Sequence, residues 1–275
     1  MARAKAIVGD VLTIDVSNML TTIAVWRFQT AQHHFQISTD DRRTADEYIV
    51  CIGRLLEGAG VQPAALAGAA IACVVPALGG AITEACTRLL GRAPLVVGPG
   101  MRTGLVVRTD NPREVGADRI ANAVAAIALF GAPVIIVDFA TALSIDVVDG
   151  AAQYVGAIIA PGIEVSAAAL ARRTAQLGSI ALVPPPSVIG DSTMHSLQSG
   201  LVFGHAAMVD GLVARVQASF GPAKVVATGE SPSAADIVPL CSSIDAFEPL
   251  LTLDGLNRLF RATIEHPTSN RRSVA

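Results

Sequence analysis

The sequence predicts a mixed α/β fold built from two similar halves, and two observations support this prediction. The first is an internal duplication. Residues 12–21 and 135–144 both read as an apolar strand, an aspartate, small and polar residues and a second β-rich run. Each stretch also opens a strand–strand–strand–helix order, as expected of a repeated unit. The second is composition, because 52% hydrophobic and only 4% aromatic residues favour the aliphatic core of an α/β enzyme.

The first half is predicted from β-branched runs and turn signals. Three strands come first, at 6–16, 21–28 and 34–38. A helix is expected at 44–56, because a cap signal precedes it and glycines that stop a helix follow it. A strand at 69–75 ends at a proline, and a helix to about residue 90 and a strand at 94–97 complete this half.

The second half is predicted to open with a helix that starts at Glu114, because Asn111-Pro112 is a turn signal and apolar residues then recur at helical spacing. The uncharged run 120–137 has the length of a membrane span, but Gly131-Ala132-Pro133 divides it into a helix and a strand. The later strands are expected at 134–139, 143–148, 154–159 and 224–228, and the later helices at 161–177, 193–220, 233–241 and 252–265.

Charge and cysteine usage exclude several classes of protein. The net charge is −3 and no basic run is present, so no nucleic-acid partner is expected. The five histidines show no metal-ligand spacing, and the four cysteines stand singly in apolar stretches, as reduced core residues do. Aspartates interrupt the apolar run near the N-terminus, so it does not read as a signal peptide. We expect a cytoplasmic protein without a membrane partner.

The densest functional chemistry lies at residues 108–119, which hold three acids, three arginines and a glycine. Asp118 and Arg119 are expected one turn inside the helix that starts here. A carboxylate beside a guanidinium at the mouth of a cleft can accept a proton and hold an anionic substrate. An ordinary helix start with surface ion pairs fits the same spacing, so spacing alone leaves both interpretations open.

The duplicated turns carry Asp15 and Asp138. Two halves that face each other would bring both turns into one cleft. There, backbone N–H groups can bind phosphates, and carboxylates can hold cations that offset phosphate charge. Two ordinary hairpins whose aspartates cap a turn would give the same pattern, so this interpretation also stays open at the level of the pattern.

Six ordered motifs, spread over nearly the whole chain, resemble those of the type III pantothenate kinases, a family of the actin-like ATPase superfamily. They are DNPREVGADR at 110–119, APGIEVS at 160–166, RTA at 173–175, SVIG at 187–190, QSG at 198–200 and VDGL at 209–212. The resemblance implies a duplicated ribonuclease H-like (actin-like ATPase) fold with two similar halves around a central cleft. The expected domains are a first half at 1–113, a second half at 114–267 and a tail at 268–275.

The resemblance implies ATP-dependent phosphorylation of pantothenate to 4′-phosphopantothenate, the first step of coenzyme A biosynthesis. Asp118 matches the family's general base, which accepts the proton of the substrate hydroxyl. The implied pantothenate-binding residues are Gly116, Ala117, Asp118, Arg119 and Thr174. Phosphoryl transfer needs mainly positioning and charge neutralisation, so a base and two cations are sufficient for the chemistry.

The resemblance also implies a nucleotide site. Its residues are Asp15, Val16, Ser17, Asn18, Met19, Leu20, Thr21, Thr22 and Thr141. Asp15 is expected near the Mg²⁺ that accompanies ATP, and Asp138 is expected to bind a monovalent cation, K⁺ or NH₄⁺. Because the family is dimeric, a homodimer is expected as well.

All three nucleotide-facing motifs depart from the family pattern, each at a glycine. Ser17 replaces a glycine in the first hairpin, where Met19 and Leu20 also replace polar residues. Ala140 replaces one in the second hairpin, and Glu230 replaces one in the motif Thr-Gly-Gly. Losing a glycine with positive φ costs on the order of 1 kcal/mol, losing a phosphate hydrogen bond costs roughly 1.5–3 kcal/mol, and a carboxylate repels phosphate.

These departures leave two hypotheses. The first is a working kinase with weak or altered nucleotide use. The second is a catalytically impaired homologue that binds pantothenate, a related ligand or a protein partner without efficient use of ATP. The persistence of Asp15, Asn18, Asp118, Asp138 and Thr141 favours the working kinase.

Overall fold

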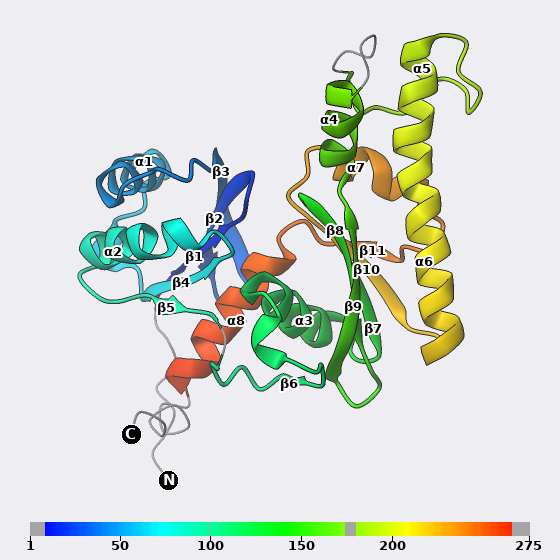
Figure 1. Ribbon diagram of the computed structural model, residues 1–275. Coiled ribbons are helices and arrows are strands. Elements are labelled where there is room, and N and C mark those ends of the chain that lie inside the picture. Colours follow the sequence, from blue (N-terminus) through cyan, green and yellow to red (C-terminus); the bar gives the residue numbers. More distant parts are fainter. Residues whose placement is uncertain (1–8, 99, 174–179, 266–275) are drawn as a thin grey trace. The chain divides into compact units, whose positions relative to one another are not determined.

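The computed structural model describes residues 9–98, 100–173 and 180–265 (Figure 1). The chain divides into two compact units. Unit 1 comprises Met1–Leu105, Asp110–Ala125 and Leu251–Ala275, and unit 2 comprises Val106–Thr109 and Ala126–Leu250. Each unit has its own sheet and its own hydrophobic core, as independent packing units do.

The sheet of unit 1 has five strands in the order β3-β2-β1-β4-β5. β1 (Val11–Val16), β2 (Leu20–Arg27) and β3 (Thr30–Ser38) form an antiparallel meander. β4 (Gly68–Cys73) pairs in parallel with β1, and β5 (Leu95–Val96) pairs in parallel with β4. The meander gives the sheet its antiparallel edge, and the later strands extend it in parallel on the other side of β1.

Helices cover both faces of this sheet (Figure 1). α1 (Ala45–Gly58) and α2 (Gly79–Leu90) pack together and share a core with alternate residues of β1. α8 (Leu251–Glu265) lies against the other face, where a Cβ at Gly68 would come within 2.5 Å of the Phe260 ring. Two short 3₁₀ helices, η1 (Pro63–Ala65) and η2 (Pro76–Leu78), complete the unit. A segment from the far end of the sequence therefore covers the second face of the first sheet.

α3 (Ala117–Phe130) begins in unit 1 and ends in unit 2. Within unit 1 its first turns pack on α8. A Cβ at Gly255 would overlap the backbone of Ala121, and the Thr252 hydroxyl donates to the buried Asn122 side chain at 2.7 Å. A buried amide requires such a partner, so α8 fixes the start of α3.

The predicted helix start at Glu114 is wrong. Pro112–Glu114 forms the 3₁₀ helix η3 instead. Its cap Asn111 accepts the N–H of Arg113 at 3.3 Å and donates its own amide to Glu114 at 2.6 Å. These local bonds close the turn and leave Val115 extended, with ψ of 120°, so the α-helix can begin only after it.

The sheet of unit 2 has six strands in the order β11-β10-β7-β8-β9-β6. β7 (Val134–Phe139), β8 (Ala142–Val148) and β9 (Gln153–Pro161) form an antiparallel meander, and β10 (Lys224–Thr228) pairs in parallel with β7. The short edge strands β11 (Ala246–Phe247) and β6 (Val106–Val107) pair in parallel with β10 and β9.

The two sheets share one topology, which confirms the predicted duplication. In each unit the first three strands form a meander, and a later strand pairs in parallel beside the first strand. The orders β3-β2-β1-β4-β5 and β9-β8-β7-β10-β11 therefore correspond strand by strand. The strand β6, which was not expected from the sequence, is the addition in unit 2.

The helices of unit 2 follow its strands in the expected order. They are α4 (Ile163–Arg173), α5 (Thr193–Gln198), the π-helix η4 (Ser199–Phe203), α6 (Gly204–Phe220), α7 (Ala234–Ile237) and the 3₁₀ helix η5 (Val238–Leu240). Three predicted helices differ from these elements, and the one at 233–241 consists of α7 followed by η5. Of the helix at 161–177, residues 174–177 lie outside the described residues, and the helix at 193–220 contains a π-helical turn.

The segment Thr193–Phe220 is long and apolar enough to cross a membrane by length and composition alone, and 39% of its most apolar window is buried in the structure. Asp210 ties this segment to unit 2 by accepting four hydrogen bonds from the backbone and hydroxyls of Ser242 and Ser243, at 2.7 to 2.9 Å. Burial alone would raise the pKa of Asp210, but these hydrogen bonds lower it below its ordinary value. An ionised carboxylate in the middle of a helix is costly in lipid.

The compact units and the predicted halves have different bounds. α8 and the start of α3 pack in unit 1, although both belong to the predicted second half, 114–267. The halves describe a repeat in the sequence, whereas the units describe packing. The domain bounds 1–113, 114–267 and 268–275 therefore stay a prediction.

Candidate active site

The first predicted phosphate-binding hairpin joins β1 to β2 in unit 1. Asp15 is the last residue but one of β1, is 7% exposed and lies opposite Thr22. The turn closes through the Ser17 N–H, which donates to the carbonyl of Leu20 at 3.1 Å, and the Ser17 hydroxyl donates to the Asp15 carboxylate at 3.4 Å. Met19 at the tip is 40% exposed. The tip is also bonded from outside the hairpin, because the Thr39 N–H donates to the Met19 carbonyl at 2.9 Å.

Ser17 and Ala140, which replace family glycines, carry no backbone strain. Among the described residues, the non-glycine residues with positive φ are Phe28 and Ala152 alone. Ser17 and Ala140 thus have conformations that any L residue adopts. This removes the strain part of the expected cost and leaves only the cost of lost contacts with phosphate.

The start of α3 brings together Gly116, Ala117, Asp118 and Arg119 in unit 1. Asp118 lies in the first helical turn, not one turn inside as predicted, and helix N-termini favour carboxylates. Its buried Oδ1 lies over Gly116, where an added Cβ would overlap it. Asp118 and Arg119 are both half-buried. The absence of a side chain at Gly116 therefore leaves the space that the Asp118 carboxylate occupies.

The second hairpin joins β7 to β8 in unit 2. Asp138 is 8% exposed and has the position in β7 that Asp15 has in β1. The Gly162 N–H donates to the carbonyl of Thr141 at 3.1 Å, and a Cβ at Gly162 would overlap the carbonyl oxygens of Ala140 and Thr141. The Thr141 hydroxyl is buried and has no hydrogen-bond partner among the described residues, as suits a group that contacts a ligand.

The loop after β10 carries the third nucleotide motif, residues 228–230, and packs on the same hairpin. Gly229 has φ of +140°, and a Cβ there would overlap the backbone of Phe139. The Ser231 N–H donates to the carbonyl of Phe139 at 3.0 Å. Both carboxylate oxygens of Glu230 are buried. The glycine that this motif retains is therefore required by the close approach of two backbones.

Asp15 and Asp138 are the carboxylates that the resemblance assigns to cations. In residues 9–98, 100–173 and 180–265 there is no group of three or more Asp, Glu, His or Cys suited to a metal ion. Mg²⁺ needs only one or two carboxylates where phosphates and water supply the remaining ligands. Single buried carboxylates at equivalent turns thus fit a cation that binds together with its nucleotide.

Among the remaining predicted site residues, Thr22 has a buried hydroxyl without a hydrogen-bond partner among the described residues, as Thr141 does. Thr174 lies outside the described residues. Val16, Asn18 and Leu20 belong to the first hairpin or its flanking strands, with Asn18 exposed. Thr21 lies on β2 and exchanges a hydrogen bond of 2.9 Å with Thr39, a contact that supports the sheet.

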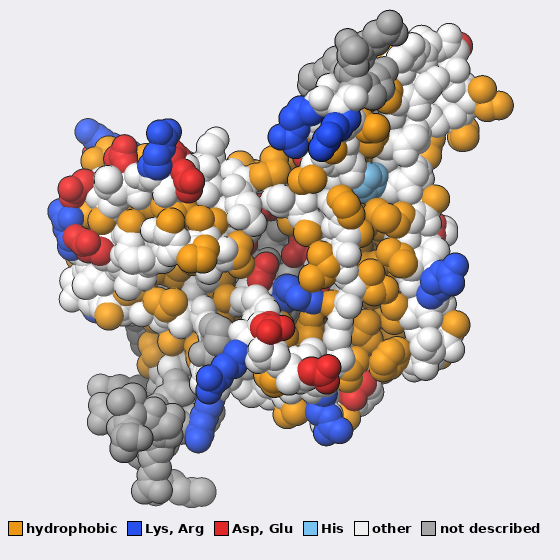
Figure 2. Space-filling view, in the orientation of Figure 1, with side chains coloured by type: hydrophobic (Ala, Val, Ile, Leu, Met, Phe, Trp, Pro, Cys, Tyr) orange, Lys and Arg blue, Asp and Glu red, His pale blue; other side chains and the backbone are white. Residues whose placement is uncertain are grey.

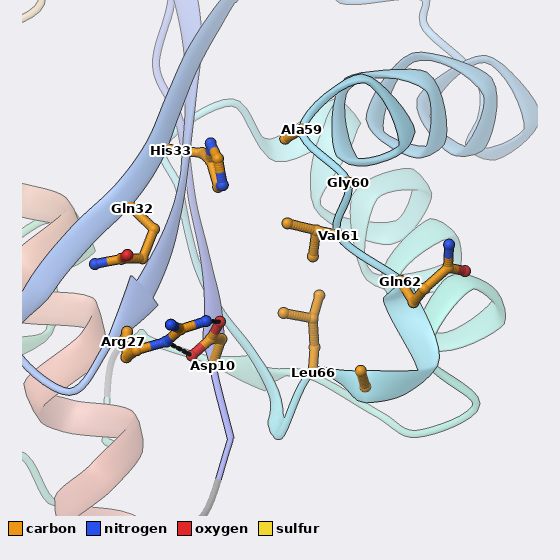
Figure 3. Close-up of a pocket in the computed structure, with 10 residues that line it drawn as sticks. Asp10, Arg27, Gln32, His33, Ala59, Gly60, Val61, Gln62 and Leu66 are labelled. Carbon is orange, nitrogen blue, oxygen red and sulfur yellow. Dashed lines mark hydrogen bonds and ion pairs between the residues drawn. The ribbon is translucent and has the colours of Figure 1, made fainter.

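A pocket of about 310 Å³ lies elsewhere in unit 1 (Figure 3). Asp10 and Arg27 form one wall, where two hydrogen bonds of 3.1 Å join the guanidinium to the carboxylate. Val61 and Leu66 form the opposite wall. Asp10 precedes β1, whereas Asp15 lies near the other end of that strand. The pocket is lined by no predicted site residue.

Comparison with known proteins identifies related sequences along most of the chain. A family model described as type III pantothenate kinase matches residues 11–215. Type III pantothenate kinase 2 of Symbiobacterium thermophilum is 42% identical over 264 residues, which cover 94% of this chain and 99% of that protein. Type III pantothenate kinase of Exiguobacterium sibiricum is 42% identical over 250 residues, which cover 91% and 98%.

Two solved structures are similar at low sequence identity. One is component A of (R)-2-hydroxyglutaryl-CoA dehydratase from Acidaminococcus fermentans, with a TM-score of 0.57, 13% identity and coverage of 94% and 98% of the two chains. The other is a conserved putative Baf family transcriptional activator from Campylobacter jejuni, with a TM-score of 0.56, 17% identity and coverage of 92% and 98%. These likenesses concern the fold alone, and they agree with a duplicated ribonuclease H-like (actin-like ATPase) fold.

Proposed function

Because the chain belongs to the type III pantothenate kinase family, we propose that it transfers the γ-phosphoryl group of ATP to the primary hydroxyl of pantothenate. The product is 4′-phosphopantothenate, which begins coenzyme A biosynthesis. The observation that carries this proposal is 42% identity to kinases of that name over nearly the full length of both chains. The retained aspartates in both duplicated hairpins support it.

In the proposed reaction, Asp118 accepts the proton of the pantothenate hydroxyl as that oxygen attacks the γ-phosphorus. The position of Asp118 in the first turn of α3, over Gly116, supports this role. Arg119 pairs with the substrate carboxylate, since a guanidinium binds carboxylates through two parallel hydrogen bonds. Gly116, Ala117 and Thr174 are the other proposed pantothenate contacts.

The nucleotide binds through the two duplicated hairpins. Residues 15–22 of the first hairpin and Thr141 of the second contact ATP, and Asp15 lies near its Mg²⁺. Asp138 holds the monovalent cation, K⁺ or NH₄⁺. These cations neutralise charge on the phosphates when bound. The buried carboxylates and the buried Thr141 hydroxyl are the features that support these assignments.

The altered nucleotide motifs are compatible with turnover. Ser17 and Ala140 need no positive φ, and Asp15 and Asp138 keep equivalent places in the two sheets. Nothing in the comparisons favours a catalytically impaired homologue. We therefore assign the working kinase, in which Met19, Leu20 and Glu230 affect the affinity for ATP rather than the chemistry.

The protein also acts as a cytoplasmic homodimer in this proposal, without nucleic-acid or membrane partners. Hydrophobic side chains gather on the face of unit 2 where β9 runs (Figure 2). Ile159, Val188 and Ile189 are 65%, 68% and 84% exposed. Ile159 lies on β9, whereas Val188 and Ile189 lie in the loop before α5. Exposed apolar surface can mark interfaces between proteins, and in this proposal a second copy of unit 2 covers the face along β9.

The experiment that tests the function is ATP-dependent formation of 4′-phosphopantothenate by the purified protein with Mg²⁺ and K⁺. Asp118→Asn is the control, and it should lower kcat about 10²- to 10⁴-fold, as removal of a general base does. Product that disappears in this variant supports both the reaction and the role of Asp118. Absence of product from the wild-type protein at high ATP would overturn the proposal.

A further inference from the structure

Ser231 joins three segments of unit 2. Its hydroxyl donates to Oε1 of Glu164, which lies 67 positions away in the first turn of α4. The same hydroxyl accepts the N–H of Ser233 at 3.2 Å, and the Ser231 N–H donates to the carbonyl of Phe139 at 3.0 Å. The start of α4, the loop after β10 and the β7–β8 hairpin therefore meet at one side chain.

Glu164 depends on this contact. Oε2 of Glu164 is buried and has no hydrogen-bond partner among the described residues. The Ser231 hydroxyl is the donor that the described residues supply to the other oxygen. A hydrogen bond to a carboxylate is roughly twice as strong as one between neutral groups, so its loss is costly when the carboxylate remains buried.

The contact also links the two segments that pack on the second hairpin. Gly162 packs on the carbonyls of Ala140 and Thr141, and Gly229 packs on Phe139. Glu164 stands two positions after Gly162, and Ser231 stands two positions after Gly229. The Ser231–Glu164 hydrogen bond thus joins the two segments that approach the hairpin, and the four residues Gly162, Glu164, Gly229 and Ser231 form a clamp on it.

We propose that this clamp positions the nucleotide-binding surface of unit 2, and that Ser231 and Glu164 are positioning residues that set the affinity for ATP. The inference rests on the proposed function, because that function makes Thr141 and residues 228–230 nucleotide contacts. The clamp also accounts for a carboxylate at position 230. Glu230 stands between Gly229 and Ser231, which are both held against the hairpin, and its carboxylate oxygens are buried, so the clamp fixes where that charge lies.

The test compares Ser231→Ala, Ser231→Thr and Glu164→Gln with wild type in steady-state kinetics, with ATP and pantothenate varied separately. Ser233→Ala is the matched control, because it removes a hydroxyl from the same loop that makes no hydrogen bond within the described residues. We expect Ser231→Ala to raise the KM for ATP about tenfold, as loss of a charge-assisted hydrogen bond predicts. The kcat and the KM for pantothenate should change less than about twofold.

Two further measurements distinguish a positioning role of Ser231 from a role in folding: rescue by Ser231→Thr and a double-mutant cycle with Glu164→Gln. Ser231→Thr keeps the hydroxyl, so it should keep the KM for ATP near the wild-type value. In a double-mutant cycle, adding Ser231→Ala to Glu164→Gln should raise the KM for ATP less than Ser231→Ala does alone. An unchanged KM for ATP in Ser231→Ala, or equal rises in the KM for both substrates, would overturn the clamp. If Ser231→Ala does not fold, the KM values for ATP and pantothenate of Glu164→Gln and Ser231→Thr test the clamp in its place.

The two proposals fail in different ways. Wild-type turnover with an unaffected Ser231→Ala overturns only the clamp. If the wild-type protein shows no turnover, calorimetric titration with ATP replaces kinetics, and a Ser231→Ala dissociation constant about tenfold weaker still supports the clamp. Wild-type protein that neither turns over nor binds ATP overturns both.

Discussion

The two duplicated hairpins begin alike but are held differently. Both carry an aspartate next to the end of a buried central strand, and both are followed by an antiparallel strand. The first is held by hydrogen bonds, some between Ser17 and its neighbours Asp15 and Leu20. Others come from the N–H groups of Thr39 and Val74, which donate to the carbonyls of Met19 and Val16 at 2.9 and 3.0 Å. The second is enclosed by close backbone packing, at Gly162 and at Gly229 in the loop after β10, and Ser231 connects that loop to the start of α4.

This difference indicates which substitutions each hairpin tolerates. The first hairpin tolerates Ser17, Met19 and Leu20 because its turn needs no positive φ and its tip is exposed. The second hairpin is closed in by backbone on two sides, so its neighbours Gly162 and Gly229 cannot gain a Cβ without a shift. Gly162 and Gly229 thus stand where backbones approach each other, and Ser17 and Ala140 stand where no positive φ is needed.

The largest effect should come from removing the carboxylates of the two hairpins one at a time. We expect Asp15→Asn to lower kcat/KM for ATP about 100-fold, and Asp138→Asn about tenfold, within the range for groups that orient a bound metal. Titrations of Mg²⁺ and K⁺ against turnover measure the difference. Asp15→Asn should shift the Mg²⁺ curve and Asp138→Asn the K⁺ curve. Identical shifts in both variants would show that the hairpins do not divide the cations as proposed.

A smaller effect is expected on stability when a methyl group is added where the clamp packs against the second hairpin. Gly162→Ala should lower the free energy of unfolding by about 1–3 kcal/mol, because the added methyl group meets backbone oxygens that cannot move away. Urea denaturation measures it. The matched control is Gly53→Ala in α1, where the nearest atom is at 3.8 Å.

The control should respond in the opposite direction. Alanine favours a helix interior, so Gly53→Ala should stabilise the protein by about 0.5–1 kcal/mol. Equal destabilisation by the two variants would show that the close backbone contact at Gly162 is not the reason why this position needs glycine.

The smallest effect is expected where the first hairpin regains the family glycine. Ser17→Gly should lower the free energy of unfolding by about 0.4–1 kcal/mol, because it adds freedom to the unfolded chain and relieves no positive φ. Thermal unfolding measures the change. A gain in stability would instead indicate that Ser17 is strained, contrary to its backbone geometry.

Much of the fold followed from local sequence. The strands of both meanders, the helices α1 and α2 and the duplication could all be predicted, because they rest on periodicity, caps and turn residues within short windows. α1 was expected to start at residue 44, and it starts at Ala45 with Thr44 as its cap, in a Thr44–Glu47 capping box with hydrogen bonds of 2.7 and 3.3 Å. The start of α3 was misplaced because Asn111 caps a 3₁₀ turn rather than the helix itself.

The sequence by itself determined the repeated strand order, the equivalent positions of Asp15 and Asp138, and membership of the family, since each depends on neighbours along the chain. Tertiary structure alone decided that α8 covers the second face of the first sheet and that Ser231 reaches Glu164. It also decided which glycines are indispensable. These contacts join segments far apart in sequence, so they depend on how the sheets bring backbones together, which no local pattern records.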